Sequence, residues 1–98
     1  MSSELSPKSV GVRLSLLRKA YGHKHQNTFA PLVDASPGAY NHWETGKQII
    51  PVEHAAKVCI LTGATLDYIY LGKTSGLPLG LAAELRILPD GLLGSSNV

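Results

Sequence analysis

The stretch QNTFAPLVDASPGAYNHWETG, from Gln26 to Gly46, decides the fold. Its first half carries a short apolar stripe at helical spacing, formed by Phe29, Leu32 and Val33. A serine and a proline follow at 36–37 and indicate a helix start, because serine caps the helix and the N–H that proline lacks would have no partner in the first turn. The second pattern ends at Glu44 or Thr45, before a glycine that suits a left-handed cap. The stretch therefore predicts two short helices joined by a tight turn.

Three further helical patterns flank this stretch. Before it, apolar residues recur every three or four positions and predict a helix from Ser9 to Tyr21, with Gly22 as a stop. After it, Pro51 opens one helix and Thr65 caps a shorter one. The expected inward positions are Val10, Leu14, Leu17 and Tyr21 in the first helix and Val52, Ala55, Ala56 and Cys59 in the next, and the last helix carries Leu66, Ile69, Tyr70 and Leu71. Because no segment has a strand pattern, the sequence predicts an all-α fold of five short helices.

The composition changes after Gly72, where glycine and proline interrupt the chain repeatedly. We therefore expect a domain over residues 8–72 and a partly ordered C-terminal tail over 73–98. Four leucines recur at helical spacing within this tail, at positions 81, 85, 88 and 92. They predict either an apolar edge that lies back on the five-helix core or a contact between two copies of the chain.

The chain has 98 residues, of which 44% are apolar and 16% charged, as expected for one small globular domain. This size excludes a multi-domain enzyme. No apolar run approaches the roughly 20 residues that a membrane span needs, and the polar start lacks the layout of a secretory signal. The single cysteine, Cys59, cannot form an internal disulfide, which is typical of a reducing compartment. These features predict a cytoplasmic protein with no membrane association.

Positive charge is concentrated near the N-terminus, although the formal net charge of the whole chain is only +2. The segment from Leu5 to Val33 has no acid and contains Lys8, Arg13, Arg18, Lys19 and Lys24. Such a region favours a polyanionic partner, because basic side chains neutralise phosphates and release counterions. Solvated lysines on the outer face of a helix explain the same charge without any partner.

The second helix of the 26–46 stretch has two chemically different faces. Tyr40, Trp43 and Glu44 fall on the side toward the core, and the outward side carries Gly38, Asn41, His42 and Thr45. Asparagine can hold adenine through two hydrogen bonds in the major groove, and histidine can donate to guanine or to a phosphate. Two helices joined by a tight turn, the second with such a face, predict a helix-turn-helix that inserts residues 36–45 into double-stranded DNA.

Phosphate contacts are predicted around the same two helices. Gln26 and Asn27 lie at the start of the first helix, where backbone N–H groups and the helix dipole favour an anion. Lys24 and Lys47 flank the two helices on either side and are natural phosphate contacts.

The pattern that supports this interpretation spans about Val10 to Gly72. It consists of Arg13-Leu14, Leu17-Arg18, Gln26-x-x-Phe29-Ala30, Ser36, Trp43-Glu44-x-Gly46-Lys47, Pro51 and Thr65-Leu-Asp-Tyr-Ile-Tyr-Leu-Gly72. Taken together, these residues resemble the lambda-repressor-like helix-turn-helix domains of the Cro and phage repressor type, the XRE family. The resemblance implies binding of operator DNA as a homodimer and regulation of transcription, with repression as the expected outcome.

Residue by residue, the resemblance implies that Gln26 binds a phosphate and that four positions read bases, namely Pro37, Gly38, Asn41 and His42. It also implies a structural ion pair between Arg18 and Glu44. We expect no catalytic activity, no cofactor and no small-molecule substrate.

Three departures from the family pattern qualify this expectation. Pro31 falls inside the first helix of the pair, where a regular helix interior would lose about 3 kcal/mol, so this helix either starts late, near Thr28, or kinks. The connection from Gly22 to Gln26 is one residue longer than usual. Pro37 and Gly38 offer no polar side chain, which leaves the readout to Asn41 and His42 and predicts a short or degenerate recognition sequence.

Other functions fit parts of the sequence. A protein-interaction module on the same fold, with weak or no DNA readout, is an alternative because Pro37 and Gly38 weaken the reading face. The four histidines lack the spacing of zinc ligands, and Cys59 on an inward stripe predicts an inert thiol. We therefore expect neither a metal site nor a nucleophilic cysteine.

Overall fold

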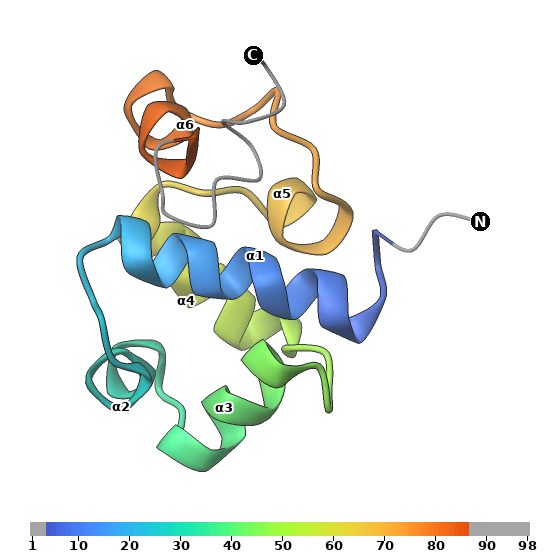
Figure 1. Ribbon diagram of the computed structural model, residues 1–98, viewed down its shortest axis with the longest axis vertical. Coiled ribbons are helices and arrows are strands. Elements are labelled where there is room, and N and C mark those ends of the chain that lie inside the picture. Colours follow the sequence, from blue (N-terminus) through green and yellow to red (C-terminus); the bar gives the residue numbers. More distant parts are fainter. Residues whose placement is uncertain (1–3, 87–98) are drawn as a thin grey trace.

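A computed structural model describes residues 4–86 of the chain, with side chains up to Leu85. Its elements are α1 (Pro7–Ala20), α2 (Gln26–Phe29), the 3-10 helix η1 (Ala30–Val33), α3 (Pro37–Thr45), α4 (Val52–Thr62), α5 (Leu66–Leu71) and α6 (Leu79–Arg86), as Figure 1 shows. No strand occurs within residues 4–86, so the all-α prediction is confirmed there. The predicted number of five helices is wrong, because six α-helices and one 3-10 helix form in this range.

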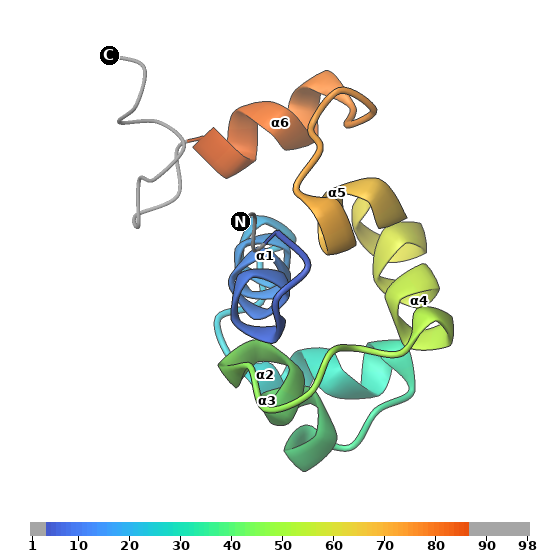
Figure 2. The ribbon, with the colours of Figure 1, turned by 90° about the vertical axis from the view of Figure 1, so that its right-hand side faces the viewer.

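The longest helix, α1, runs through the middle of the fold. It has α2 and α3 on one side and α6 on the other (Figures 1 and 2), and it packs directly against α3, α4, α5 and α6. Val10, Leu14 and Leu17 of this helix are fully buried, as their spacing predicts. No helix among the described residues is long and apolar enough to cross a membrane.

Local capping signals in the sequence account for most helix ends. The Ser36 hydroxyl accepts a hydrogen bond from the Ala39 N–H over 3.1 Å, and Thr65 caps α5 in the same way. The start of α1 was predicted two residues too late. It begins at Pro7, where Ser6 accepts from the Ser9 N–H, so the serine-proline signal that marks α3 also marks α1.

Pro31 neither delays nor simply kinks the helix that contains it. The α-helix begins at Gln26, makes one turn to Phe29 and then tightens into the 3-10 helix η1, which has Pro31 in its first turn. Because proline has no N–H and its ring crowds the carbonyl four residues before it, the chain cannot continue as a regular α-helix through this position. The predicted late start near Thr28 is therefore wrong, and the interruption expected at Pro31 takes the form of a change from α-helix to 3-10 helix.

Several residues predicted to face the core are exposed, and each has a geometric reason. In a 3-10 helix, residues three apart eclipse one another, so Ala30 and Val33 share the buried face and Leu32 is turned outward. Tyr21 lies beyond the last turn of α1 and stacks on His23. Val52 is exposed at the start of α4, whose fully buried residues are Ala55 and Val58.

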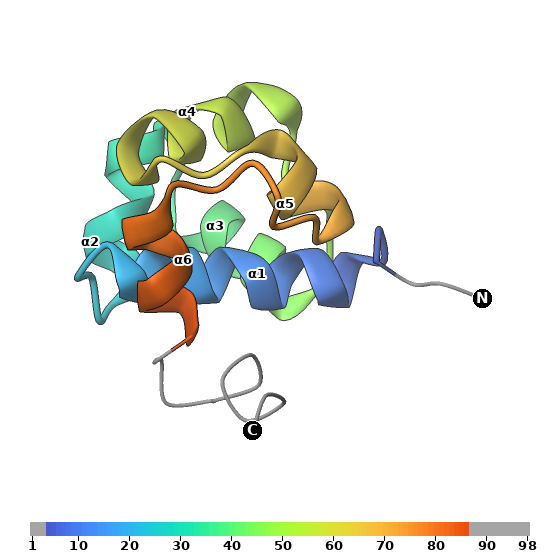
Figure 3. The same cartoon turned by 90° about the horizontal axis from the view of Figure 1, so that it is seen from above.

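The segment after Gly72 belongs to the packed fold as far as Arg86. Leu77 and Leu85 are buried in the main core, and α6 lies across the C-terminal half of α1 (Figure 3). The prediction that the tail leucines lie back on the core is thus confirmed for Leu85. Leu88 and Leu92 lie outside the described residues, and Leu81 is partly buried against the core.

A glycine in α1 allows α3 to approach this helix closely. A Cβ atom at Gly11 would lie 2.6 Å from the Trp43 carbonyl oxygen and closer still to that of Glu44. Both atoms belong to the backbone of α3, so they cannot rotate away as a side chain would. Gly11 therefore fixes how deeply α3 sits against α1.

Candidate nucleic-acid interface

The outward face of α3 carries the residues that the sequence assigned to it. Pro37, Gly38, His42 and Thr45 are exposed and Asn41 is half-buried, whereas Tyr40 and Trp43 are buried in the core. No acidic side chain is exposed on this helix, because Glu44, its one acid, has a side chain only 5% exposed. The face is small, polar and without negative charge.

Arg18 and Glu44 form the ion pair that the resemblance implies. The Arg18 Nε and Nη2 atoms donate to the two carboxylate oxygens of Glu44 over 2.8 and 3.1 Å. This two-point contact joins α1 to α3, and the hydrogen bond to Glu44 raises the pKa of Arg18. The Nη1 atom donates in addition to the carbonyl oxygens of His23 and Lys24, so the same guanidinium fixes the connection from α1 to α2.

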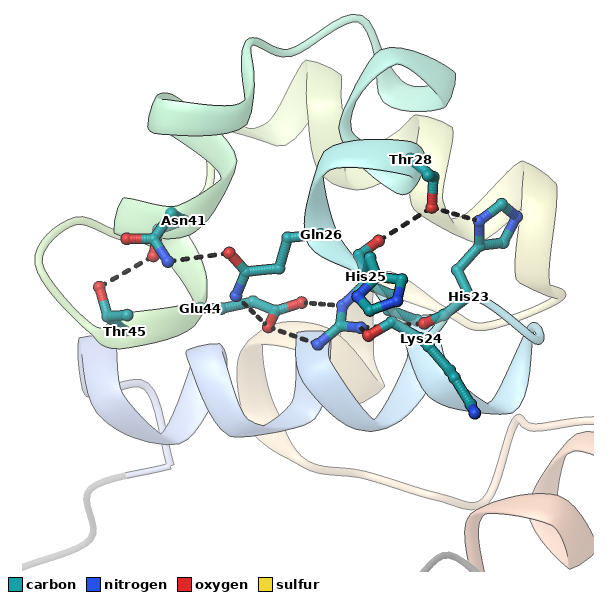
Figure 4. A network of polar contacts seen from close by, with 9 residues as sticks. His23, Lys24, His25, Gln26, Thr28, Asn41, Glu44 and Thr45 are labelled. Carbon is teal, nitrogen blue, oxygen red and sulfur yellow. Dashed lines mark hydrogen bonds and ion pairs between the residues drawn. The ribbon is translucent and has the colours of Figure 1, made fainter.

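A chain of polar contacts leads from this ion pair to the outer face of α3, as Figure 4 shows. Gln26 Nε2 donates to Glu44 Oε1 over 2.9 Å, and Asn41 Nδ2 donates to Gln26 Oε1 over 2.8 Å. Gln26, at the start of α2, thereby bridges the buried carboxylate and the residue predicted to read bases. Sequence reasoning had assigned Gln26 to a phosphate and had not connected it to Asn41.

The donors and acceptors in this series of side-chain hydrogen bonds have one consistent arrangement. A carboxylate paired with arginine only accepts hydrogen bonds, so Gln26 turns its NH₂ group toward Glu44 and its carbonyl oxygen toward Asn41. Asn41 must then turn its NH₂ group toward Gln26. Its amide keeps the carbonyl oxygen and one N–H for a ligand.

The neighbouring side chains differ in the hydrogen-bond donors and acceptors that remain for a ligand. The Thr45 hydroxyl donates to the Asn41 carbonyl oxygen over 2.8 Å, so outward it is an acceptor. His42 and Asn27 are exposed. Thr28 donates to the His25 carbonyl oxygen and contacts His23 Nδ1, which holds the longer connection before α2 in a compact form.

Positive charge borders the C-terminal end of α3, and a further cation lies in the connection before α2. Lys24 and Lys47 are exposed, and the Lys24 side chain extends away from the Gln26 network (Figure 4). Lys8 at the start of α1 is a third cation at this border, because its stem packs close to Gly46 at the end of α3. The sequence had counted Lys8 only as part of a basic segment, since nothing local to residue 8 indicates that it meets residue 46.

The residues considered for metal binding and nucleophilic chemistry do not converge. Within residues 4–86, no group of three or more His, Cys, Asp or Glu side chains is placed to hold a metal ion. His54 Nδ1 lies 2.8 Å from the Val33 carbonyl oxygen, which can only accept, so this nitrogen carries a proton. Burial raises the pKa of the Cys59 thiol and so disfavours the reactive thiolate.

No protein-family model, curated protein or solved structure matches this chain. The resemblance to lambda-repressor-like domains therefore rests on the residues of the chain itself, and the functional argument rests on the geometry of α2, η1 and α3.

Proposed function

We propose that this protein binds double-stranded DNA as a lambda-repressor-like helix-turn-helix domain and regulates transcription, most simply as a repressor. In this proposal α2 with η1 forms the first helix of the motif and α3 is the helix that enters the major groove. Cytoplasmic function and a homodimeric state belong to the same proposal.

The observation that supports the proposal best is the series of hydrogen bonds that leads from Arg18 through Glu44 and Gln26 to Asn41. It fixes the orientation of one half-buried amide on a helix face without negative charge. The remaining acceptor and donor of Asn41 are the pair that adenine requires at N6 and N7. A side chain ordered before binding loses less conformational entropy when it meets a base.

Each side chain then has a role in the proposed complex. Asn41 reads a base, and His42 beside it contacts a second base or a phosphate. Lys24, Lys47 and Lys8 bind phosphates, and Thr45 accepts a hydrogen bond. Gln26 acts as a positioning residue for Asn41, because one N–H of its amide donates to Glu44 and its carbonyl oxygen accepts from Asn41.

The first experiment is a titration of the chain with a random-sequence duplex at several salt concentrations. Phosphate binding requires the logarithm of the association constant to fall linearly with the logarithm of the salt concentration. Lys47→Ala should weaken all sequences alike and reduce the slope by about one. The matched control is Lys73→Ala, an exposed lysine that follows α5, which should leave the slope unchanged. A flat response of the unaltered protein contradicts the proposal and favours the interaction module.

A second experiment separates base readout from phosphate binding. Duplexes selected from a random pool give the preferred sequence, and Asn41→Ala should reduce the preference over single mismatches by about 1–3 kcal/mol while leaving the salt slope in place. Gln26→Met should also reduce the preference without changing the slope. If Gln26→Met lowers the slope instead, Gln26 is a phosphate contact and not a positioning residue.

The selected sequences also test the homodimer. Two copies of α3 related by a two-fold axis would read half-sites about 34 Å apart, one turn of DNA. A preferred sequence with dyad symmetry at this spacing supports the dimer, and a single short site contradicts it. Leu85 is excluded as a dimer contact in this fold, because it is buried against the core.

A further inference from the structure

A cavity of about 300 Å³ opens on the molecule between α1 and α5. It is lined by Glu4, Ser9, Val12, Arg13, Leu16, Tyr68, Gly72 and Thr74. None of these residues belongs to α2, η1 or α3, so the cavity is separate from the candidate interface. Its volume is at the lower end of the range found for small-molecule sites in proteins.

The cavity combines apolar walls with one nearly buried cation. Val12 and Leu16 lie one turn apart on α1 and provide aliphatic surface. The Arg13 side chain is only 11% exposed. Apolar walls with a few convergent polar or charged groups, here Arg13 and Glu4, are the usual composition of a site for a small ligand.

The Arg13 guanidinium makes short hydrogen bonds to the backbone of α5 and a longer contact to the carboxylate of Glu4. Its Nε atom donates to the Ile69 carbonyl oxygen over 2.9 Å and its Nη2 atom to that of Tyr70 over 3.1 Å, which fixes it to the end of α5. Its Nη2 atom also donates to the Glu4 carbonyl oxygen. The Nη1 atom reaches the Glu4 carboxylate at 3.5 Å, the upper limit for a hydrogen bond.

The carboxylate that faces Arg13 is easily exchanged. The Glu4 side chain is 61% exposed, and exposed ion pairs contribute little free energy because water and salt screen them. Burial lowers the pKa of Arg13, and the charge of Glu4 only partly offsets this effect. A carboxylate held inside the cavity would be screened less than Glu4 and would interact with the guanidinium more strongly.

We propose that this cavity binds a small organic carboxylate. Its apolar body packs against Val12 and Leu16, and its carboxylate replaces that of Glu4 at the Arg13 Nη1 atom. Gly72 borders this contact without a side chain, since a Cβ there would lie 3.1 Å from Nη1.

Benzoate is the probe for this site, with benzamide as its uncharged equivalent. Amide resonances of Val12, Leu16 and Gly72 are followed by nuclear magnetic resonance during titration of the full chain. Benzoate should bind with a millimolar dissociation constant, because so small a ligand buries few atoms, and benzamide should bind at least about tenfold more weakly. Equal binding of the two probes, or shifts confined to other parts of the chain, overturns the proposal.

Two variants separate the proposed contact from a general effect on the fold. Glu4→Gln removes the competing carboxylate and should tighten benzoate binding by about two- to fivefold, the range that corresponds to an exposed ion pair. Val12→Trp fills the mouth of the cavity and should abolish binding, whereas Ile60→Trp, at an exposed position of α4 outside the cavity, should not. Weaker binding by Glu4→Gln, or equal binding by the two tryptophan variants, contradicts the site.

Discussion

Two arginines of α1 are nearly buried, and they differ in the carboxylate that each one faces. The Arg18 and Glu44 side chains are 6% and 5% exposed, and they meet through two hydrogen bonds. Arg13 is 11% exposed, but the side chain of its partner Glu4 is 61% exposed, and the Glu4 carboxylate lies 3.5 Å from the Arg13 Nη1 atom. The pKa of Arg18 is raised by its hydrogen bond to Glu44, whereas the pKa of Arg13 is lowered by burial.

This difference teaches how the same residue type serves two purposes in one helix. A guanidinium whose carboxylate is buried with it forms a fixed unit, and at Arg18 this unit extends to Gln26 and Asn41. A guanidinium whose carboxylate is exposed keeps part of its charge available to another anion. The first arrangement positions a surface, and the second leaves the cavity that we propose to bind a small carboxylate.

The largest expected effect comes from breaking the buried pair. Glu44→Gln leaves the Arg18 charge buried without its counter-ion and should lower the free energy of unfolding by about 3–5 kcal/mol. Urea denaturation measures this change. The matched control is Glu84→Gln at an exposed position of α6, which should change stability by less than about 0.5 kcal/mol. A loss below about 1 kcal/mol for Glu44→Gln would show that the pair is not effectively buried.

An intermediate effect is expected where α3 rests on α1. Gly11→Ala places a Cβ against the backbone of α3 and should cost about 1–3 kcal/mol, although alanine favours a helix more than glycine does. Gly80→Ala in α6 meets no atom within 4 Å and should stabilise the fold by up to about 1 kcal/mol. Thermal unfolding of both variants distinguishes the two cases, and a stabilised Gly11→Ala variant would contradict the close approach.

The smallest effect is expected at the exposed pair. Glu4→Gln should change the free energy of unfolding by less than about 1 kcal/mol, and the difference should disappear at high salt because exposed charges are screened. Chemical denaturation at low and high salt measures it. A salt-independent loss as large as that of Glu44→Gln would mean that the two arginines are held in the same way.

Features with short-range causes were predicted well from the sequence. The start of α3 at Pro37 and its end before Gly46 follow from residues within one turn of each helix end. The ion pair between Arg18 and Glu44 was also anticipated, although through the resemblance and not through spacing. The outward positions of Gly38, His42 and Thr45 follow from the 3.6-residue period once one buried residue is known.

Features that depend on helix geometry were predicted less well. Leu32 was assigned to the core because the stripe was read with an α-helical period, whereas Pro31 changes that segment to a 3-10 helix. Residues 79–86 were expected only as part of a partly ordered tail with leucines at helical spacing, and α6 forms there and packs on α1. Ser6 and Pro7 form the same serine-proline helix start as Ser36 and Pro37. The start of α1 was nevertheless predicted from the spacing of its apolar residues, which places it two residues too late.

The sequence by itself determined the all-α class of residues 4–86, the caps of α3 and α5 and the polar outer face of α3, because these depend on chemistry within a few residues. Only the tertiary structure decided that Gln26 orients Asn41 and that Arg13 faces a cavity beside Glu4. The residues that hold these side chains lie up to 57 residues apart in the chain, as Arg13 and Tyr70 do. Their meeting depends on the angle and depth at which helices pack, and no local pattern encodes these quantities.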